Sequence, residues 1–244
     1  MLKNKKYKIP TVPLSQLFPS IVTMLALCLG ITAVRYALDD KFDTAAILII
    51  VASVMDGLDG RLARLLNATT AFGAQLDSLA DLVSFGVAPA IVTYLWSLYQ
   101  IPYKGVGWAV ILLFITCAAF RLARFNISRS DPKNFSIGVP MPAAACLCIT
   151  PMILSFQILD LHENYWLIAI YMISVGILMA SRVPTFVLKH MHIQRNKILP
   201  IMLMLTILII LLLIMPWIVF PILSAAYLIS IPFSIISYKK IRVN

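Results

Sequence analysis

Four aspartates lie close together in the sequence, within a stretch that is otherwise apolar enough to cross a membrane. They are Asp56, Asp59, Asp77 and Asp81, and the whole chain has only ten acidic residues. Carboxylates at membrane depth are costly, so by default they mark a functional site. Oxygen ligands suit hard cations such as Mg²⁺ and Mn²⁺. Because two such ions about 3.5–4 Å apart assist displacement at phosphorus, the sequence predicts metal-dependent phosphoryl-transfer chemistry.

Helical spacing places these aspartates on two faces that a short turn can bring together. The residues that share the first helical stripe, at spacings of three and four, are Asp56, Asp59, Gly60, Ala63 and Arg64. Asp77 and Asp81 share a face of the next helix, one turn apart. The polar segment 67–72 suits a turn between two antiparallel helices. Four carboxylates brought this close would repel one another unless cations neutralised them.

The small and basic neighbours of the aspartates suit a substrate that contains phosphate. Gly60 and Ala63 leave room for a bulky group near the backbone, and Arg64 offers a forked cation for phosphate. The alternative is that the glycines and Ala63 only pack helices together, as small residues do in membrane bundles. That alternative does not account for four acids with few cations near them in the sequence.

The pattern D-x2-D-G-x2-A-R-x8-G-x3-D-x3-D resembles the signature of the CDP-alcohol phosphotransferases. Its eight fixed positions are Asp56, Asp59, Gly60, Ala63, Arg64, Gly73, Asp77 and Asp81. Eight residues at fixed spacing are a specific signal, unlike a lone glycine motif. The resemblance implies an integral membrane enzyme, expected as a homodimer, that displaces CMP from a CDP-linked lipid and joins the phosphatidyl group to an alcohol.

The resemblance also implies a role for each site residue. Asp56 and Asp77 would bridge two divalent metal ions, Asp59 would complete the first site, and Asp81 the second. Asp81 would also accept the proton of the attacking hydroxyl as the catalytic base. The residues implied to contact the CDP-lipid are Pro19, Ser20, Ile21, Val22, Gly60, Ala63, Arg64 and Thr70. The family commonly has Asn where this chain has Ser20.

Downstream segments indicate which alcohol is accepted. Those that resemble the branch of the family that uses L-serine are 85–90 (FGVAPA), 121–126 (RLARFN) and 138–142 (GVPMP). Arg121 and Arg124 lie one turn apart at the end of a predicted span, where one could fork onto a serine carboxylate. The alternative is that both only anchor the helix at the cytoplasmic surface. Glycerol 3-phosphate would also suit these arginines, and inositol or choline is less favoured.

Two functions from outside the family are alternatives to phosphatidyl transfer. A divalent-cation transporter could use four intramembrane aspartates, but it has no need for the Gly-x-x-Ala-Arg pattern beside them. A phospholipase-D-like route requires His-x-Lys motifs. None of His162, His190 and His192 is followed by Lys two positions later, so this route is not favoured.

The elements that must position these residues are transmembrane helices. The chain is 61% hydrophobic and 12% charged, with a mean hydropathy of +0.94, which is typical of polytopic membrane proteins. A span needs about 20 residues, and suitable runs occur at 18–38, 44–66, 73–99, 105–125, 141–160, 164–181, 198–214 and 216–237. The sequence predicts an all-α transmembrane bundle of about eight spans around a six-helix catalytic core.

The basic residues predict the orientation of this bundle, because cytoplasmic loops carry the excess of Lys and Arg. With eight spans and both termini in the cytoplasm, all of the 20 basic residues except Arg35, Lys41 and Lys104 fall on the cytoplasmic side. Seven spans would move the basic C-terminal end outside. The aspartates are therefore predicted at the cytoplasmic face of the cell (inner) membrane, where CMP can leave.

The remaining features predict one domain embedded in a lipid bilayer. Residues 18–244 form a single predicted domain with its catalytic motif at 56–81, and residues 1–17 are predicted to lie on the cytoplasmic membrane surface. The first span is expected to be retained rather than cleaved. The net charge of +10 is spread over short loops, which favours anionic lipid headgroups and not nucleic acid. The four cysteines are predicted to be reduced packing residues.

Overall fold

The computed structural model describes residues 18–65, 70–103, 105–128, 136–181, 184–185 and 198–243. In chain order the helices are α1 (Phe18–Leu38), α2 (Phe42–Leu65), α3 (Ala71–Asp81), the π-helix η2 (Leu82–Val87), α4 (Ala88–Trp96), the short 3-10 helix η3 (Leu98–Gln100), α5 (Val106–Ser128), α6 (Met141–Ser155), α7 (Tyr165–Ala180), α8 (Ile198–Ile214) and α9 (Pro216–Val243). Two short strands, β1 (Ser136–Ile137) and β2 (Pro184–Thr185), pair antiparallel. Helix occupies each of the eight predicted apolar runs. The predicted segment 1–17 and the histidines at 190 and 192 lie outside the described residues.

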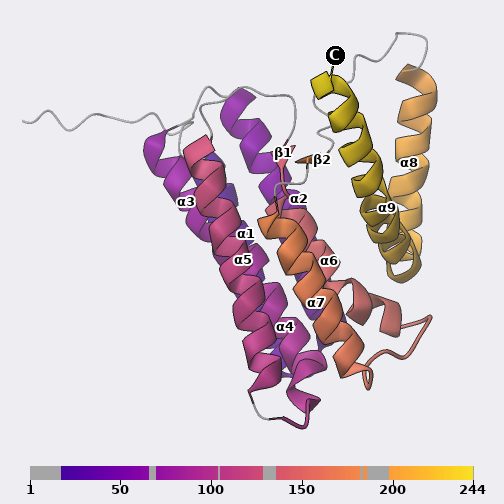
Figure 1. Cartoon of the computed structure of the whole chain (residues 1–244). Helices are drawn as coiled ribbons and strands as arrows, with labels where there is room; N and C mark the ends of the chain where they lie inside the picture. Colours follow the sequence, from indigo (N-terminus) through magenta and orange to yellow (C-terminus); the bar gives the residue numbers. More distant parts are fainter. Residues whose placement is uncertain are drawn as a thin grey trace, which may run out of the picture.

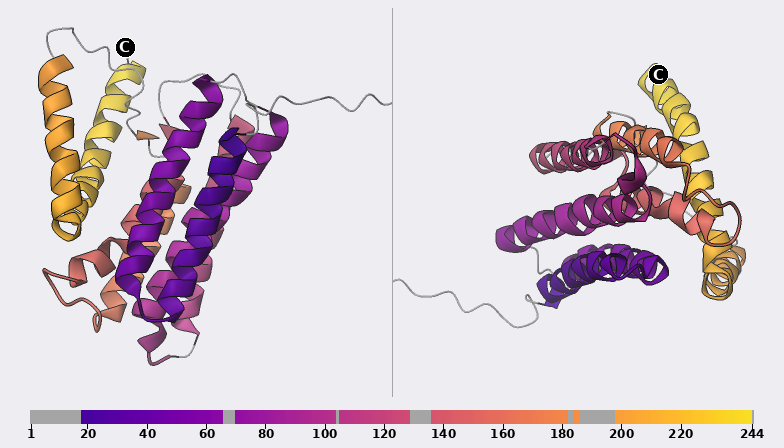
Figure 2. Two further views of the ribbon diagram at one scale, coloured as in Figure 1. Left: turned by 180° about the vertical axis from the view of Figure 1, so that it is seen from behind. Right: turned by 90° about the horizontal axis from the view of Figure 1, so that it is seen from below.

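Successive helical segments run in opposite directions along the bundle, with α3, η2 and α4 forming one segment (Figure 1). The beginning of α1 and the end of α9 consequently lie at the same end of the bundle, which is uppermost in Figure 1 and is called the upper end below. The helices α8 and α9 form a hairpin beside the others, with α9 packed against α6 (Figure 2). The two last apolar runs are thus separate helices that turn at Met215.

The helices have the length and the surface expected in a membrane. By length and composition, Phe18–Leu38, Ala71–Trp96 and Val106–Ile127 could each cross a bilayer. The helices α6, α7, α8 and α9 contain shorter apolar segments. Large apolar side chains such as Ile170 and Leu213 are exposed on the outside, where a water-soluble protein would present polar groups. The prediction of a polytopic membrane helix bundle is confirmed.

Small residues bring α1 into close contact with its neighbours. The buried face of α1 includes Ala26, Gly30, Ala33 and Ala37, spaced by three or four residues, and such faces let membrane helices approach closely. A Cβ added at Gly30 would lie 2.8 Å from Cα of Ser84 in η2. The Ser84 hydroxyl donates to the carbonyl of Ala26 at 3.3 Å. Gly30 therefore allows η2 to reach α1.

The third apolar run contains a widened turn that its hydropathy does not predict. The π-helix η2 begins directly after Asp81. Pro89, near the start of α4, has no N–H to donate, and its ring displaces the carbonyl four residues earlier. A π turn contains an extra residue, so it shifts the face that the following residues present. As a result α3 carries its acids toward one side while α4 packs into the core.

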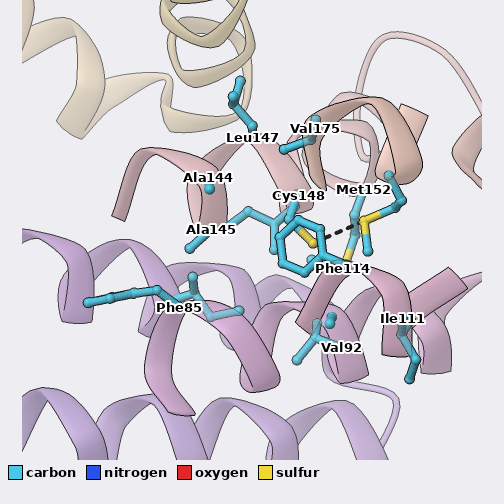
Figure 3. Close-up of a cluster of buried hydrophobic side chains, with 14 of the residues drawn as sticks. Phe85, Val92, Ile111, Phe114, Ala144, Ala145, Leu147, Cys148, Met152 and Val175 are labelled. Carbon is cyan, nitrogen blue, oxygen red and sulfur yellow. Dashed lines mark hydrogen bonds between the residues drawn. The ribbon is translucent and has the colours of Figure 1, made fainter. Parts of the chain in front are cut away.

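Figure 3 shows the part of the apolar core that lies between α4, α5, α6 and α7, with η2 at its edge, and buried residues of α1 and α2 belong to the same core. Phe85 and Phe114 are fully buried there. The thiol of Cys148 lies 3.2 Å from the sulfur of Met172. All four cysteines are free: Cys117 and Cys148 are buried, Cys146 is half-buried and Cys28 is exposed on α1. This rigid core supports the polar side chains at the upper end.

Candidate active site

Asp56 and Asp59 from α2 meet Asp77 from α3 near the upper end of the bundle. One carboxylate oxygen from each of the three lies within 4.8 Å of the others. Asp59 is 4% exposed, and the other two are half-buried. Two helices joined by a short connection thus bring acids that are about 20 residues apart in the sequence to one point.

Asp81 lies one turn beyond Asp77 and makes a side-chain hydrogen bond with Asp56. Two ionised carboxylates have no hydrogen to share, so they need a proton or a cation between them. All the donor atoms of this group are carboxylate oxygens, and the site is partly buried. These residues therefore fit a hard divalent cation.

The hydroxyl of Thr23 from α1 fixes the position of Asp59. It donates to Oδ2 of Asp59 at 2.8 Å, and it lies 3.1 Å from the carbonyl of Pro19, one turn earlier on its own helix. Thr23 is itself buried. A hydrogen bond of this kind orients a carboxylate that could bind a metal.

Replacing Thr23 with valine, which keeps the shape but removes the hydroxyl, is expected to weaken divalent-metal affinity by about 10- to 100-fold. Titration of Mn²⁺ into the purified protein measures this affinity directly. The matched control is Thr32→Val on the same helix, because the exposed Thr32 hydroxyl donates only to the carbonyl of Cys28. Wild-type affinity in Thr23→Val would show that this hydroxyl does not support the site.

The beginning of α3 lies beside the beginning of α1. The Thr70 side chain caps α3 by accepting from the backbone N–H of Gly73 at 3.0 Å. A Cβ at Gly73 would lie 3.1 Å from Oγ1 of Thr70 and 3.5 Å from Oγ of Ser20. Two of the predicted CDP-lipid contacts, Ser20 and Thr70, are therefore neighbours next to the aspartates.

The other predicted CDP-lipid contacts have different surroundings. Pro19 and Val22 are buried, whereas the Ile21 side chain is 51% exposed. A Cβ added at Gly60 would meet no atom of the described residues within 4 Å, so there is open space beside the acids. Ala63 and Arg64 lie in α2, but their side chains are outside the described part of the chain.

The two arginines near the end of α5 differ sharply in their contacts. Arg124 donates from Nη1 to the carbonyl of Ala180 at 2.8 Å and from Nη2 to that of Ser181 at 2.9 Å. These bonds satisfy carbonyls at the end of α7. Gly138, at φ +84°, packs against the same guanidinium, 3.3 Å from a Cβ placed there. Arg124 thus ties α5 to α7.

Arg121 is 6% exposed and its guanidinium stacks toward the ring of Phe125 at 5.9 Å. Among the residues that the structure describes, its Nε has no hydrogen-bond partner. It lies within electrostatic range of Asp81 from α3 and of Tyr227 from α9. Arg121 therefore combines proximity to Asp81 with a buried N–H that has no partner among the described residues.

Three contacts in this region were not predicted from the sequence. They are the bond from Thr23 to Asp59, the proximity of Tyr227 to Arg121, and a pair of hydrogen bonds between Ser78 and Asn126 at 3.1 and 3.2 Å. The sequence offered only one indication of these contacts, which is that the residues involved are polar and lie within or next to apolar runs. Ser78 lies between Asp77 and Asp81, so its bond to α5 fixes the orientation of α3.

The comparisons with known proteins agree with this arrangement. Residues 16–175 match the family model described as CDP-alcohol phosphatidyltransferase, and residues 197–232 match a second one, CDP-alcohol phosphatidyltransferase 2. The first match contains the four aspartates and both arginines of α5.

Curated relatives are similar over most of the chain. The CDP-diacylglycerol–serine O-phosphatidyltransferase of Mycobacterium bovis is 34% identical over 231 residues, which cover 92% of this chain and 80% of that protein. The Helicobacter pylori protein of the same name is 42% identical over 175 residues, with 70% and 73% covered. An archaetidylserine synthase of Methanothermobacter thermautotrophicus is 34% identical over 167 residues, with 68% and 67% covered. With its converging aspartates and these matches, the chain belongs to the CDP-alcohol phosphatidyltransferase family.

Proposed function

We propose that this chain is a membrane enzyme that transfers the phosphatidyl group from CDP-diacylglycerol to L-serine, giving phosphatidylserine and CMP. The observation that carries the proposal is the convergence of Asp56, Asp59 and Asp77, whose oxygens lie within 4.8 Å of one another, beside the open space at Gly60. The choice of serine is supported by relatives named for serine transfer at 34–42% identity.

The aspartates would hold two divalent metal ions, Mg²⁺ or Mn²⁺. Asp56 and Asp77 would be shared by both ions, with Asp59 completing one site and Asp81 the other. Bound ions would neutralise the phosphate charge and so make CMP a better leaving group. Thr23 orients Asp59 for this role through its 2.8 Å bond.

Asp81 acts as the general base in this proposal. The serine hydroxyl oxygen forms a bond to the β-phosphorus of the CDP-lipid, the bond from that phosphorus to CMP breaks, and the hydroxyl proton passes to the Asp81 carboxylate. A carboxylate positioned in this way contributes about 10²–10⁴-fold to the rate. Its contact with Asp56 is consistent with a position next to the metal ligands.

The CDP group would bind between the beginnings of α1 and α3. Ser20 and Thr70 lie together there, and the N-terminal end of a helix favours phosphate. Gly60 leaves the space that a bulky nucleotide needs. The remaining proposed contacts are Pro19, Ile21, Val22, Ala63 and Arg64.

Of the two arginines on α5, Arg121 is the one proposed to bind the acceptor directly. Its buried Nε is available, and the residue lies within range of Asp81, so an acceptor held there would present its hydroxyl to the base. Arg124 is engaged with the carbonyls at the end of α7, which supports a positioning role for it. A phosphate-bearing acceptor such as glycerol 3-phosphate is the alternative within the family.

The active site is proposed to face the cytoplasm, with both termini on that side of the cell membrane. The upper end holds the aspartates, Arg121 and Arg124, whereas Asp39, Asp40 and the other acids outside the motif cluster mainly in connections at the opposite end. This distribution follows the preference of cytoplasmic segments for basic residues. A homodimer stays a prediction from the family.

The test is serine-dependent release of CMP. Purified protein with CDP-diacylglycerol and Mg²⁺ or Mn²⁺ is expected to release CMP and form phosphatidylserine only when L-serine is added. Release that requires glycerol 3-phosphate or inositol, and not serine, would show that the acceptor is assigned wrongly. Movement of divalent cations across vesicles without any CMP release would instead support a transporter.

A further inference from the structure

Two buried polar atoms near the site have no hydrogen-bond partner among the residues that the structure describes. They are Nε of Arg121 on α5 and the hydroxyl of Tyr227 on α9. A buried donor left without a partner costs about 1–3 kcal/mol, so such atoms rarely persist without something to bind. The two residues are within electrostatic range of each other, so a small ligand that lies between the two side chains could contact both of them.

The position of Tyr227 is set by the packing of α9 on α6. One turn earlier on α9, Ser224 accepts a hydrogen bond from the hydroxyl of Thr150 at 2.9 Å. Phe220 and Ile231, on either side along the helix, are buried. The tyrosine hydroxyl is therefore held at a defined place. The helix α9 lies outside residues 16–175, the part of the chain that matches the first family model.

The region between the two atoms suits an anionic group with two oxygens. Arg121 contributes a cation with a free N–H, and Tyr227 contributes a neutral O–H, so both can donate to the same acceptor group. Charge-assisted hydrogen bonds to a carboxylate are about twice as strong as neutral ones. Asp81 is also within electrostatic range of Arg121, so a small molecule whose carboxylate binds here could place its hydroxyl near the base.

We propose that Tyr227 is a specificity-determining residue of the acceptor site, where its hydroxyl and Nε of Arg121 together bind the carboxylate of L-serine. This inference rests on the proposed function. It gives the C-terminal hairpin a direct part in acceptor selection, because the Tyr227 hydroxyl strengthens the binding of an alcohol that carries a carboxylate. An acceptor without that group would leave both donors unpaired.

The test is Tyr227→Phe, which removes only the hydroxyl. The KM for L-serine is expected to rise by about 10- to 100-fold, while the KM for CDP-diacylglycerol stays as in the wild type and kcat changes by less than about threefold. The matched control is Ser224→Ala, which removes the hydrogen bond between α6 and α9 but leaves the tyrosine hydroxyl. If Ser224→Ala raises the KM for serine as much, the effect comes from helix packing and the inference is wrong.

A second measurement uses L-serinamide, which has the size of serine but no carboxylate. The wild-type protein is expected to favour serine over serinamide by about 100-fold or more in kcat/KM, and Tyr227→Phe should reduce this preference about 10-fold. Equal use of the two acceptors by the wild type would overturn the inference even if the variant does not fold.

A wild-type protein that shows no serine-dependent CMP release would contradict the proposed function itself. Serine-dependent release with an unchanged KM in Tyr227→Phe would contradict only the role of Tyr227.

Discussion

Asp81→Asn is expected to lower the turnover number by about 10²–10⁴-fold, the contribution of a positioned general base. Asparagine has nearly the same shape, so α3 should keep its fold and its bonds through Ser78 to α5. The amide cannot accept the proton of the serine hydroxyl. Affinity for CDP-diacylglycerol should remain close to that of the wild type at saturating Mg²⁺ or Mn²⁺, because three of the four proposed metal ligands, Asp56, Asp59 and Asp77, are unchanged.

Single-turnover measurements of phosphatidylserine formation, together with binding of CDP-diacylglycerol, separate these two effects. Asp43→Asn is the control, since it makes the same chemical change in the first turn of α2, far from the acid cluster along that helix. A general base would lower the single-turnover rate at saturating lipid. If Asp81→Asn instead abolishes lipid binding and leaves the rate of bound substrate unchanged, Asp81 is a binding residue and not the base.

Removal of divalent metal is expected to abolish CMP release, and Asp77→Asn to prevent its recovery when metal is added back. Asp77 is the carboxylate from α3 that meets the two from α2. Carboxylates this close repel one another, so binding of a cation should stabilise the folded protein. At an ion concentration 100 times the dissociation constant, that stabilisation is about 2.7 kcal/mol.

Thermal unfolding in detergent, measured with and without Mg²⁺ or Mn²⁺, checks this prediction independently of activity. The wild type should gain stability when metal is added, and Asp77→Asn should gain much less. Without metal the variant should be at least as stable as the wild type, because one repelling charge is gone. A metal-dependent increase of wild-type size in Asp77→Asn would place the ion elsewhere.

Hydropathy was sufficient to locate the helices, because a membrane span requires a long apolar run and helix occupies each of the long apolar runs in this chain. The run at 18–38 corresponds to α1 and the run at 198–214 to α8. Hydropathy did not predict the π turn of η2. That turn depends on the missing N–H of Pro89 and on the close approach of Ser84 to Gly30, which is a contact between residues far apart in the sequence.

The spacing of the aspartates alone was enough to predict that they converge, since residues three or four apart share a helix face and a short connection makes two helices neighbours. The different surroundings of Arg121 and Arg124 could not be predicted in this way. Both lie on the same face of α5, yet Arg124 reaches the end of α7, while Arg121 is within electrostatic range of Asp81 and Tyr227.

The sequence by itself determined the helices and the convergence of the four acids, because both follow from local periodicity and composition, and its eight-residue motif indicated the family by resemblance. Only the tertiary structure decided that Thr23 holds Asp59 and that Tyr227 comes within electrostatic range of Arg121. Those contacts join residues that are 36 or more positions apart in the chain. They depend on how small residues such as Gly30 let helices approach, and on the direction in which each side chain leaves its helix.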